Sequence, residues 1–335
     1  MKALLVCVGV CCVLLAGCSS GDNSSGSAED GSTTINQLQP SEADVVEPEE
    51  TDAPDSTDCT LRGEDSKSDL DPVRKDFKGC DLSGADLTGA DLTGANLEDA
   101  NLTRANLFSA NLTNANLRNA NLEGVNLTEA NLTKADLTNV NLQCAPEGSS
   151  LLYCSVLSKA VLTEANLTEA DLTKAVLLGA NLSRANLSGA ILSDANLREL
   201  NLTNANMSYA ILSGADMTLT DLTGANLSNS SVSSDTRLSQ VNLTDADLTE
   251  ANWQDADLSV FGSYPAVNLT RANLSKAFLT NANLLDAILT DANLSDADLT
   301  GADLYGANLT GADLNGVRWE NTTCPSGSVQ STPCQ

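Results

Sequence analysis

A leucine recurs at every fifth position along most of this chain, and that period limits how the chain can fold. The unit is a small residue, usually Ala, followed by Asn or Asp, Leu, Thr or Ser, and one variable residue, as in ANLTN at 110–114. On an α-helix, leucines five apart would step by about 140° and spread around the whole surface. On a flat strand they would point to opposite faces in turn. Neither regular element buries the leucines together.

The leucines can share one interior if the chain bends once in every unit. Ala85 and Leu87 then point inward, Asp86 points outward, and Thr88 and Gly89 turn the corner. Repeated corners coil the chain, and each coil can pair its backbone with the next at about 4.8 Å, the spacing of a parallel sheet. Alanine suits the inward position beside the corner because a larger side chain would prevent a narrow coil from closing. The sequence therefore predicts an all-β solenoid.

The period is interrupted at three places, where the chain can leave the wall of the solenoid. These interruptions are an odd unit at Ala145–Ser149, one extra residue at Asp235, and an insertion at Phe261–Ala266. We expect wall units from Lys75 to Cys144, from Ser150 to Ser234 and, beyond the later interruptions, as far as Asn321. Insertions in repeat proteins often carry function, although many are only tolerated. The recognition-loop candidates are Pro146, Gly148, Tyr153, Phe261 and Tyr264.

The residues alone leave open whether a coil holds three units or four. Outward apolar residues coincide at a spacing of twenty in two pairs and at a spacing of fifteen in two others. These pairs are Val156/Val176 and Ile191/Ile211 at twenty, and Val161/Val176 and Val176/Ile191 at fifteen. At fifteen, Asp298 would also stack on Asp313, and like charges side by side on a ladder are unfavourable. Twenty is therefore slightly favoured.

From Lys75 to Asn321 the units resemble those of the pentapeptide repeat family, which read A(D/N)LxX. The resemblance implies a right-handed quadrilateral parallel β-helix with four units in each coil. Some members of this family are acidic rods that imitate duplex DNA and protect or inhibit DNA gyrase. The resemblance therefore also implies an alternative function, that of an acidic DNA-mimic inhibitor or protector of DNA gyrase.

Residues 1–17 have the features of an export signal. Lys2 precedes an apolar run, Ala3–Leu15, which is too short to span a bilayer but suits the centre of a secretory signal. The run ends in Leu15-Ala16-Gly17-Cys18, which resembles the lipobox of bacterial lipoproteins. This resemblance implies cleavage before Cys18, acylation of its sulfur and amine, and a lipid anchor on the extracytoplasmic side of a bacterial membrane. An ordinary signal peptide with a chance Cys is the alternative.

The segment 18–58 separates the expected lipid anchor from the expected solenoid, 59–335. After Cys18 it is rich in Gly, Ser, Asp, Glu, Pro and Thr and has almost no large apolar residue, as in Glu47-Pro48-Glu49-Glu50. Such a composition cannot bury enough surface to offset the entropy of the chain. We therefore expect an acidic, disordered tether, with an interaction site for a basic partner as the alternative.

Six cysteines remain once Cys18 and those of the signal segment are set aside, and an even number in an exported chain suggests disulfides. Proximity in the sequence predicts the pairs Cys59–Cys80, Cys144–Cys154 and Cys324–Cys334. The first and last pairs would hold the two ends of the solenoid, and the middle pair would clip the base of a loop. Zinc is the alternative, but the chain has no His and its mature part has no CxxC motif.

An open solenoid end exposes apolar surface and unpaired backbone, so both ends need caps. At the C-terminal end Trp319 stands where Leu is expected. We expect Trp319 to plug the last coil, with the loop between Cys324 and Cys334 as a lid. Binding of an aromatic ligand or a sugar at Trp319 is the alternative.

The chain carries 45 acidic and 17 basic residues, for a formal charge of −28. This field repels nucleic-acid phosphates and attracts a positively charged partner. Outward carboxylates such as Asp81, Asp86 and Asp91 lie on successive faces and diverge, and no nucleophile has an evident base. We therefore expect no enzyme, no nucleic-acid partner, no cofactor and no metal. The alternatives are an enzyme acting on acidic polysaccharides, calcium binding by the Asp and Asn columns, and ice binding by the Thr ranks.

Together these features predict a non-enzymatic lipoprotein of the cell envelope. A lipid at Cys18 would hold it on the membrane, and the tether would carry a rigid β-solenoid that acts as a structural or protein-interaction scaffold. The expected partner is an envelope protein or cell-wall material.

Overall fold

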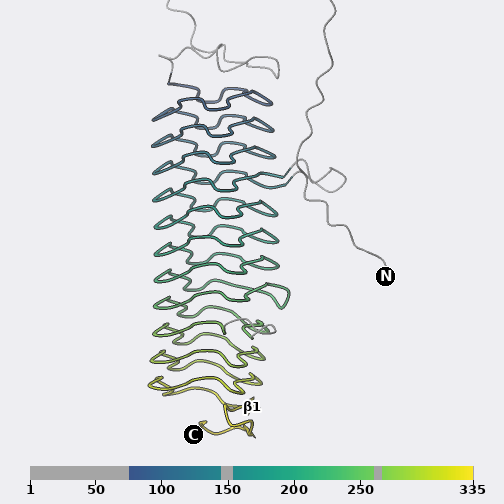
Figure 1. Cartoon of the computed structure of the whole chain (residues 1–335), viewed down its shortest axis with the longest axis vertical. Coiled ribbons are helices and arrows are strands. Elements are labelled where there is room, and N and C mark those ends of the chain that lie inside the picture. Colours follow the sequence, from purple (N-terminus) through teal and green to yellow (C-terminus); the bar gives the residue numbers. More distant parts are fainter. Residues whose placement is uncertain (1–74, 145–153, 260–265, 335) are drawn as a thin grey trace, which may run out of the picture. The chain divides into compact units, whose positions relative to one another are not determined.

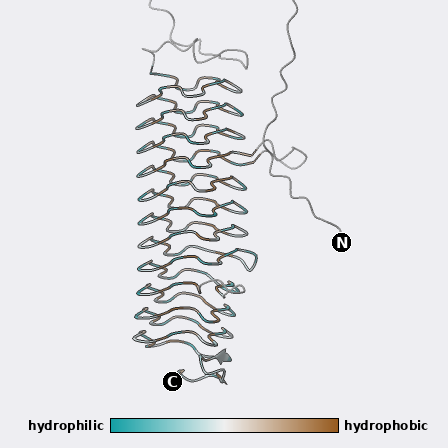
Figure 2. Ribbon diagram, viewed as in Figure 1, coloured by the Kyte–Doolittle hydropathy of each residue, from teal (hydrophilic) through white to brown (hydrophobic). Residues whose placement is uncertain are grey.

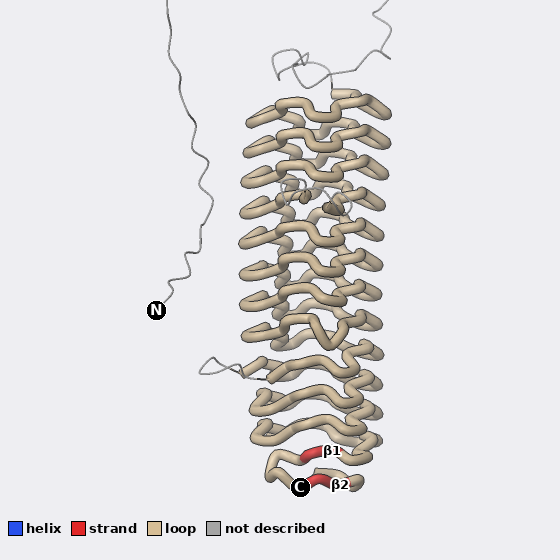
Figure 3. The backbone as a smooth tube through the Cα atoms, turned by 90° about the vertical axis from the view of Figure 1, so that its right-hand side faces the viewer, coloured by secondary structure: helices blue, strands red, loops and turns tan. Residues whose placement is uncertain are grey.

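Short coils stack on one another to form the solenoid (Figure 1). The computed structural model describes residues 75–144, 154–259 and 266–334. Within these residues there is no helix that is long and apolar enough to cross a membrane. The two strands with more than a single bridge are β1, Thr322–Thr323, and β2, Val329–Gln330, at the C-terminal end (Figure 3).

Neighbouring coils are joined by parallel bridges between residues twenty positions apart. Asp76 pairs with Asn96, and the same spacing links Val156 to Val176 and Ile191 to Ile211. A coil therefore holds four units, which confirms the expected right-handed quadrilateral parallel β-helix and decides between fifteen and twenty.

A regular corner is a four-residue turn with a residue of left-handed backbone conformation in its third place. In the unit at 110–114, Ala115 N–H donates to Leu112 O at 3.0 Å, and Asn114 has a φ of 58°. The side chain of Asn111 holds the same corner, because its Oδ1 accepts from Thr113 N–H at 3.2 Å and from the Thr113 hydroxyl at 2.7 Å. The repeated Asn or Asp is thus a structural part of the turn.

The interior consists of stacked leucines and alanines, and apolar and polar positions alternate along every coil (Figure 2). Leu182 and Ala190, for example, are both 1% exposed or less. Two polar substitutions in the interior are hydrogen-bonded to each other. Trp253 stands in a leucine position, and its indole N–H donates to Oγ of Ser230, which stands in an alanine position, at 3.1 Å. Thr220, in an alanine position, donates to Leu197 O at 2.7 Å, so this buried hydroxyl also keeps a partner.

The C-terminal lid lies over part of the last coil. β1 pairs antiparallel with β2, the Cys324–Cys334 disulfide closes the loop, and Trp319 is 5% exposed. On the other side of the same coil, inward residues are only half-buried. These residues are Leu309, Ala312, Leu314 and Val317. Trp319 is therefore buried as expected, but the lid leaves one side of the end open.

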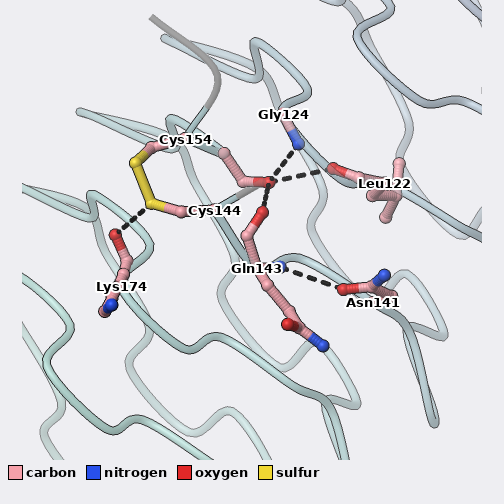
Figure 4. The surroundings of a disulfide bond; sticks show 8 residues. Leu122, Gly124, Asn141, Gln143, Cys144, Cys154 and Lys174 are labelled. Atoms are coloured by element: carbon pink, nitrogen blue, oxygen red, sulfur yellow. Dashed lines mark hydrogen bonds between the residues drawn. A yellow bond between two sulfur atoms is a disulfide. The ribbon is translucent and has the colours of Figure 1, made fainter. Parts of the chain in front are cut away.

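The first interruption is longer than expected, because Asn126 pairs with Val156, thirty positions later. Ten residues are therefore extra, and the wall resumes at Ser155 instead of at Ser150. The Cα atoms of Cys144 and Cys154 lie 3.8 Å apart, which is one peptide step, and their disulfide closes the base of the excursion (Figure 4). Ser155 takes the alanine position and donates to Leu122 O at 2.9 Å.

The other two interruptions have the expected lengths. Asp216 pairs with Arg237, so this coil is one residue longer than a regular coil, and the extra residue at Asp235 accounts for the difference. Asn242 pairs with Asn268, so this coil is six residues longer than a regular coil, and the insertion after Val260 accounts for the difference. The wall thus returns to its register after each interruption.

We predict that the ten-residue excursion can be removed without unfolding the wall. In a variant that lacks 145–154 and carries Cys144→Asn, residue 144 is joined directly to Ser155, which restores the five-residue step from Asn141 to Val156, and the substitution removes a thiol that would have lost its partner. The free energy of unfolding should change by less than about 1 kcal/mol, as for surface changes. Circular dichroism and thermal melting measure this. Loss of the β signal would show that the excursion is part of the wall.

We also predict opposite signs for two leucine-to-glycine changes on exposed leucines of the wall. Leu219 is 44% exposed and has a φ of 64°, a conformation that costs L-residues about 1–2 kcal/mol. Leu219→Gly should stabilise the wall by about 0.5 kcal/mol after the added freedom of the unfolded chain is subtracted. Leu178, 39% exposed and without a left-handed φ, is the matched control, and Leu178→Gly should destabilise. Urea unfolding of both variants tests the pair.

Candidate functional site

The four sides of the solenoid are defined here by the outward residues of the first coil. Face A begins at Asp76, face B at Asp81, face C at Asp86 and face D at Asp91, and bridges continue each face from coil to coil. Because the chain passes through the faces in this order, faces A and C lie on opposite sides. The outward residues of face C are Asp86, Asn106, Asn126, Val156, Val176, Asn196, Asp216, Arg237, Asp257, Asn283, Asp303 and Thr323.

All three interruptions of the repeat adjoin face C. The Cys144–Cys154 excursion lies between Asn141 of face B and Val156 of face C. The extra Asp235 lies at the same edge, four coils further along. The last insertion follows Asp257 of face C and precedes Asn268 of face D. Face C is therefore bordered by every departure from the regular wall that the sequence contains.

Large apolar side chains gather on face C at the position that follows the leucine. Four wall units in the described residues carry such a side chain there, and all four belong to face C. These residues are Phe108, Leu178, Leu285 and Tyr305. Phe108, Leu178 and Tyr305 are 37%, 39% and 53% exposed. On face D, by contrast, the same position holds only Thr or Ser among the described units.

Face A carries an unbroken column of Asn and Asp, whose side chains form hydrogen bonds with one another and with their own corners. Asn186 donates its amide to Asn166 Oδ1 at 3.2 Å, and Asn206 donates to Asn186 Oδ1 at 2.9 Å. The same oxygens hold the corners, as Asn206 Oδ1 does for Ser208 N–H. In the part of the chain that is described, no group of three or more potential metal-ligating side chains converges. The Asp and Asn columns are thus explained by the turns and ladders that they make.

The wall opens on face C between the coil that contains Arg237 and the coil that contains Asp257. No bridge joins these two residues, and the N–H of Leu238 has no hydrogen-bond partner among the described residues, although Leu238 is 1% exposed. Before the last coil, every other described residue in a leucine position donates its N–H to a neighbouring coil. A hollow of about 340 Å³ lies here. Its lining residues are Ser234, Asp235, Thr236, Arg237, Leu238, Ser239 and Asp257.

Beside the hollow, two arginines share one carboxylate. Asp216 Oδ2 lies 3.3 Å from Arg237 Nη1 and 3.5 Å from Arg198 Nη1. Burial of this carboxylate opposes its ionisation, but hydrogen bonds from Thr218 and from Arg237 and the charge of Arg198 lower the pKa of Asp216 below its ordinary range. Arg237 is therefore already paired, while the hollow keeps the carboxylates of Asp235 and Asp257.

Those two carboxylates are only partly engaged. Asp235 Oδ1 accepts a hydrogen bond from the Ser233 hydroxyl, and Asp257 Oδ1 accepts one from Ser259 N–H at 3.1 Å. For Oδ2 of either residue, no hydrogen bond or ion pair is found within the described residues. With Arg237 paired to Asp216, the balance of charge in the hollow is negative.

The structure brings together only some of the predicted site residues. Cys144–Cys154 and Cys324–Cys334 form disulfides, and Cys80 is disulfide-bonded to a partner outside the described residues. The remaining candidates also lie outside the described residues. These are Cys18, Cys59, Pro146, Gly148, Tyr153, Phe261 and Tyr264. Face C itself was missed, because its residues line up only at a spacing of twenty.

We predict that the ion pairs of Asp216 make the stability of the wall depend on pH. A lowered pKa in the folded state stabilises the fold above the ordinary pKa of Asp, and this contribution is lost as the pH falls through the lowered value. Asp216→Asn should therefore destabilise by about 1 kcal/mol at pH 7 and by less at pH 2. Urea unfolding at the two pH values measures the difference.

Asp221 is the matched control, because it occupies the same position in the next unit. It accepts the corresponding hydrogen bonds from Thr223, but no ion pair to it is found among the described residues. Asp221→Asn should show a smaller change between the two pH values. An equal change in both variants would mean that the arginines contribute nothing.

The sequence matches the family model described as pentapeptide repeats in eight stretches. The matched residues are 76–107, 105–143, 150–189, 180–218, 201–233, 234–259, 268–304 and 302–323. Together they span nearly all of the described wall. A search of curated proteins found no significant match.

Solved structures of similar proteins include HetL, QnrB1 and Rfr23. HetL, a pentapeptide repeat protein of Nostoc sp. strain PCC 7120 involved in heterocyst differentiation regulation, is 32% identical; the match covers 77% of this chain and 94% of HetL, with a TM-score of 0.24. QnrB1, a plasmid-mediated fluoroquinolone resistance protein, is 18% identical over 73% and 85% of the two chains, with a TM-score of 0.21. Rfr23 of the cyanobacterium Cyanothece 51142 is 22% identical over 58% and 88%, with a TM-score of 0.16.

Proposed function

Since the chain belongs to the pentapeptide repeat family, we propose that it is a noncatalytic scaffold, lipid-anchored in the bacterial envelope, that presents face C to a partner protein. The observation that carries this proposal is the gathering on face C of all three interruptions and of the apolar side chains at Phe108, Leu178, Leu285 and Tyr305. On the other faces no described unit carries a large apolar side chain at the position that follows the leucine, although exposed apolar residues such as Phe278 of face B occur at other positions.

The lipid anchor is supported by the order of segments in the sequence. The apolar run before Cys18, the lipobox-like Leu15-Ala16-Gly17-Cys18 and the acidic segment to residue 58 follow one another as in a tethered lipoprotein. About 40 residues of flexible chain would have a typical reach of some 35 Å, enough to lift a solenoid off the membrane surface.

A noncatalytic role is supported by the way the polar groups are used. In the wall, outward carboxylates and amides accept hydrogen bonds from their own corners, as Asp91 Oδ1 does from Thr93 N–H at 3.1 Å. A general base needs to be within hydrogen-bond reach of a nucleophile and of its substrate. Side chains that are engaged in this way by their own corners are instead suited to holding the shape of the wall.

A partner-binding role for face C is supported by the physics of interfaces. Aromatic side chains are enriched at protein interfaces, and Tyr is among the residue types that provide most of the binding energy there. Phe108 and Tyr305 lie nine coils apart on the same face. A partner that contacts both would have to lie along the solenoid.

The lipid anchor at Cys18 is tested by labelling cells with a radioactive fatty acid. We predict that the full chain takes up the label and that Cys18→Ala abolishes the uptake and releases the protein from the membrane fraction. Retention of label in Cys18→Ala, or its absence in both proteins, would overturn the anchor. Cytoplasmic location, with inhibition of gyrase supercoiling by the purified protein, would instead support the alternative of an acidic DNA mimic.

The contact face is tested by photo-crosslinking in intact cells. A photoreactive phenylalanine analogue at Tyr305 of face C is expected to capture a partner protein, whereas the same analogue at Thr310, exposed on face D of the same coil, is not. Equal capture at both positions would mean that face C has no special role.

A further inference from the structure

We propose that the opening in face C binds an extended, lysine- or arginine-bearing segment of a partner protein by pairing with its backbone. This inference rests on the proposed scaffold function and names the chemistry of the partner at one point of face C. The opening lies between the coil of Arg237 and the coil of Asp257, where the regular ladder is broken.

The first argument is the unpaired backbone. In a regular coil the N–H of the leucine position donates to the outward residue of the next coil, as Leu222 N–H does to Asn242 O at 2.8 Å. Leu238 is the exception, since its N–H has no such acceptor among the described residues although the residue is buried. An unmet N–H in a buried place costs free energy, and an added strand can supply the missing carbonyl.

The second argument is the charge of the opening. The carboxylates of Asp235 and Asp257 line it, and each keeps Oδ2 without a partner among the described residues, whereas Arg237 is held by Asp216 at 3.3 Å. A cationic side chain beside the two carboxylates would gain charge-assisted hydrogen bonds. An acidic segment would be repelled, so the opening selects a basic one.

The third argument is the size and origin of the opening. At about 340 Å³ it falls in the range of sites that hold small ligands or a few residues of a peptide. It occurs where the extra Asp235 and the insertion after Val260 border the same two coils on face C. Together these two interruptions remove the backbone pairing on face C at one level of the wall and leave it intact on this face above and below.

The inference is tested with fluorescent ten-residue peptides and the full mature chain in detergent. We expect a peptide of alternating Lys and Thr to bind in a saturable way, and a peptide of alternating Glu and Thr not to bind. Asp257→Asn should weaken the binding at least tenfold, and methylation of the peptide's backbone nitrogens should weaken it by a similar factor. Asp313→Asn, on the opposite face A, is the matched control and should leave the affinity unchanged.

A second variant closes the opening. Removal of Asp235 together with 260–265 restores a spacing of twenty and should abolish binding while circular dichroism and melting stay close to those of the parent. If this variant fails to fold, Asp257→Asn and the methylated peptide still decide the matter. Equal binding to Asp257→Asn and to the parent, or no binding of the Lys-Thr peptide, would overturn the inference. Neither result would alter fatty-acid labelling or capture at Tyr305, so failure of the scaffold function would be recognised separately.

Discussion

The structure depends on the corner that closes each five-residue unit. A left-handed residue in the third place of the turn brings the next alanine inward, as Asn114 does before Ala115. The Asn or Asp of the unit then holds the corner through its side chain, as Asn111 does. Once the corner is made, every leucine points to the same interior, and the backbone of each coil is placed to pair with the next. The hydrophobic core, the ladder and the polar columns all follow from this one turn.

The wall could be predicted from the sequence because every five-residue unit contains the residues that determine its own turn and its own buried positions. A leucine at every fifth position excludes a helix and a flat strand, and Gly at positions such as Gly89 marks the corner. The spacing between coils could not be read in the same way, since three units or four would both bury the leucines. The pairing of Val156 with Val176 shows that a coil holds four units, and only with this number can residues be assigned to faces. A property that depends on stacking is invisible to a reading of one unit at a time.

The same reason explains why the candidate site was found only in part. The excursion between Cys144 and Cys154 was recognised as a loop, because the two cysteines are close in the sequence. Its true length was missed, since the five-residue period resumes in the sequence at Ser150, whereas the pairing of Asn126 with Val156 counts ten extra residues. The convergence of Phe108 and Tyr305 on one face was missed as well. Those residues are nearly two hundred positions apart, and only the twenty-residue coil brings them into line.

A regular solenoid offers a partner no particular place to bind, because one coil presents almost the same surface as the next. Recognition requires a departure from the repeat, and each departure puts the pairing of neighbouring coils at risk. The excursion closed by Cys144 and Cys154 avoids that cost, because its ends lie one peptide step apart and the wall continues across them. The interruptions near Asp235 and Asp257 do not avoid it, and the N–H of Leu238 is left without a partner among the described residues. A wall whose other described coils are paired can tolerate this local loss, and the unpaired backbone then distinguishes this level of the solenoid from the other described levels before the last coil.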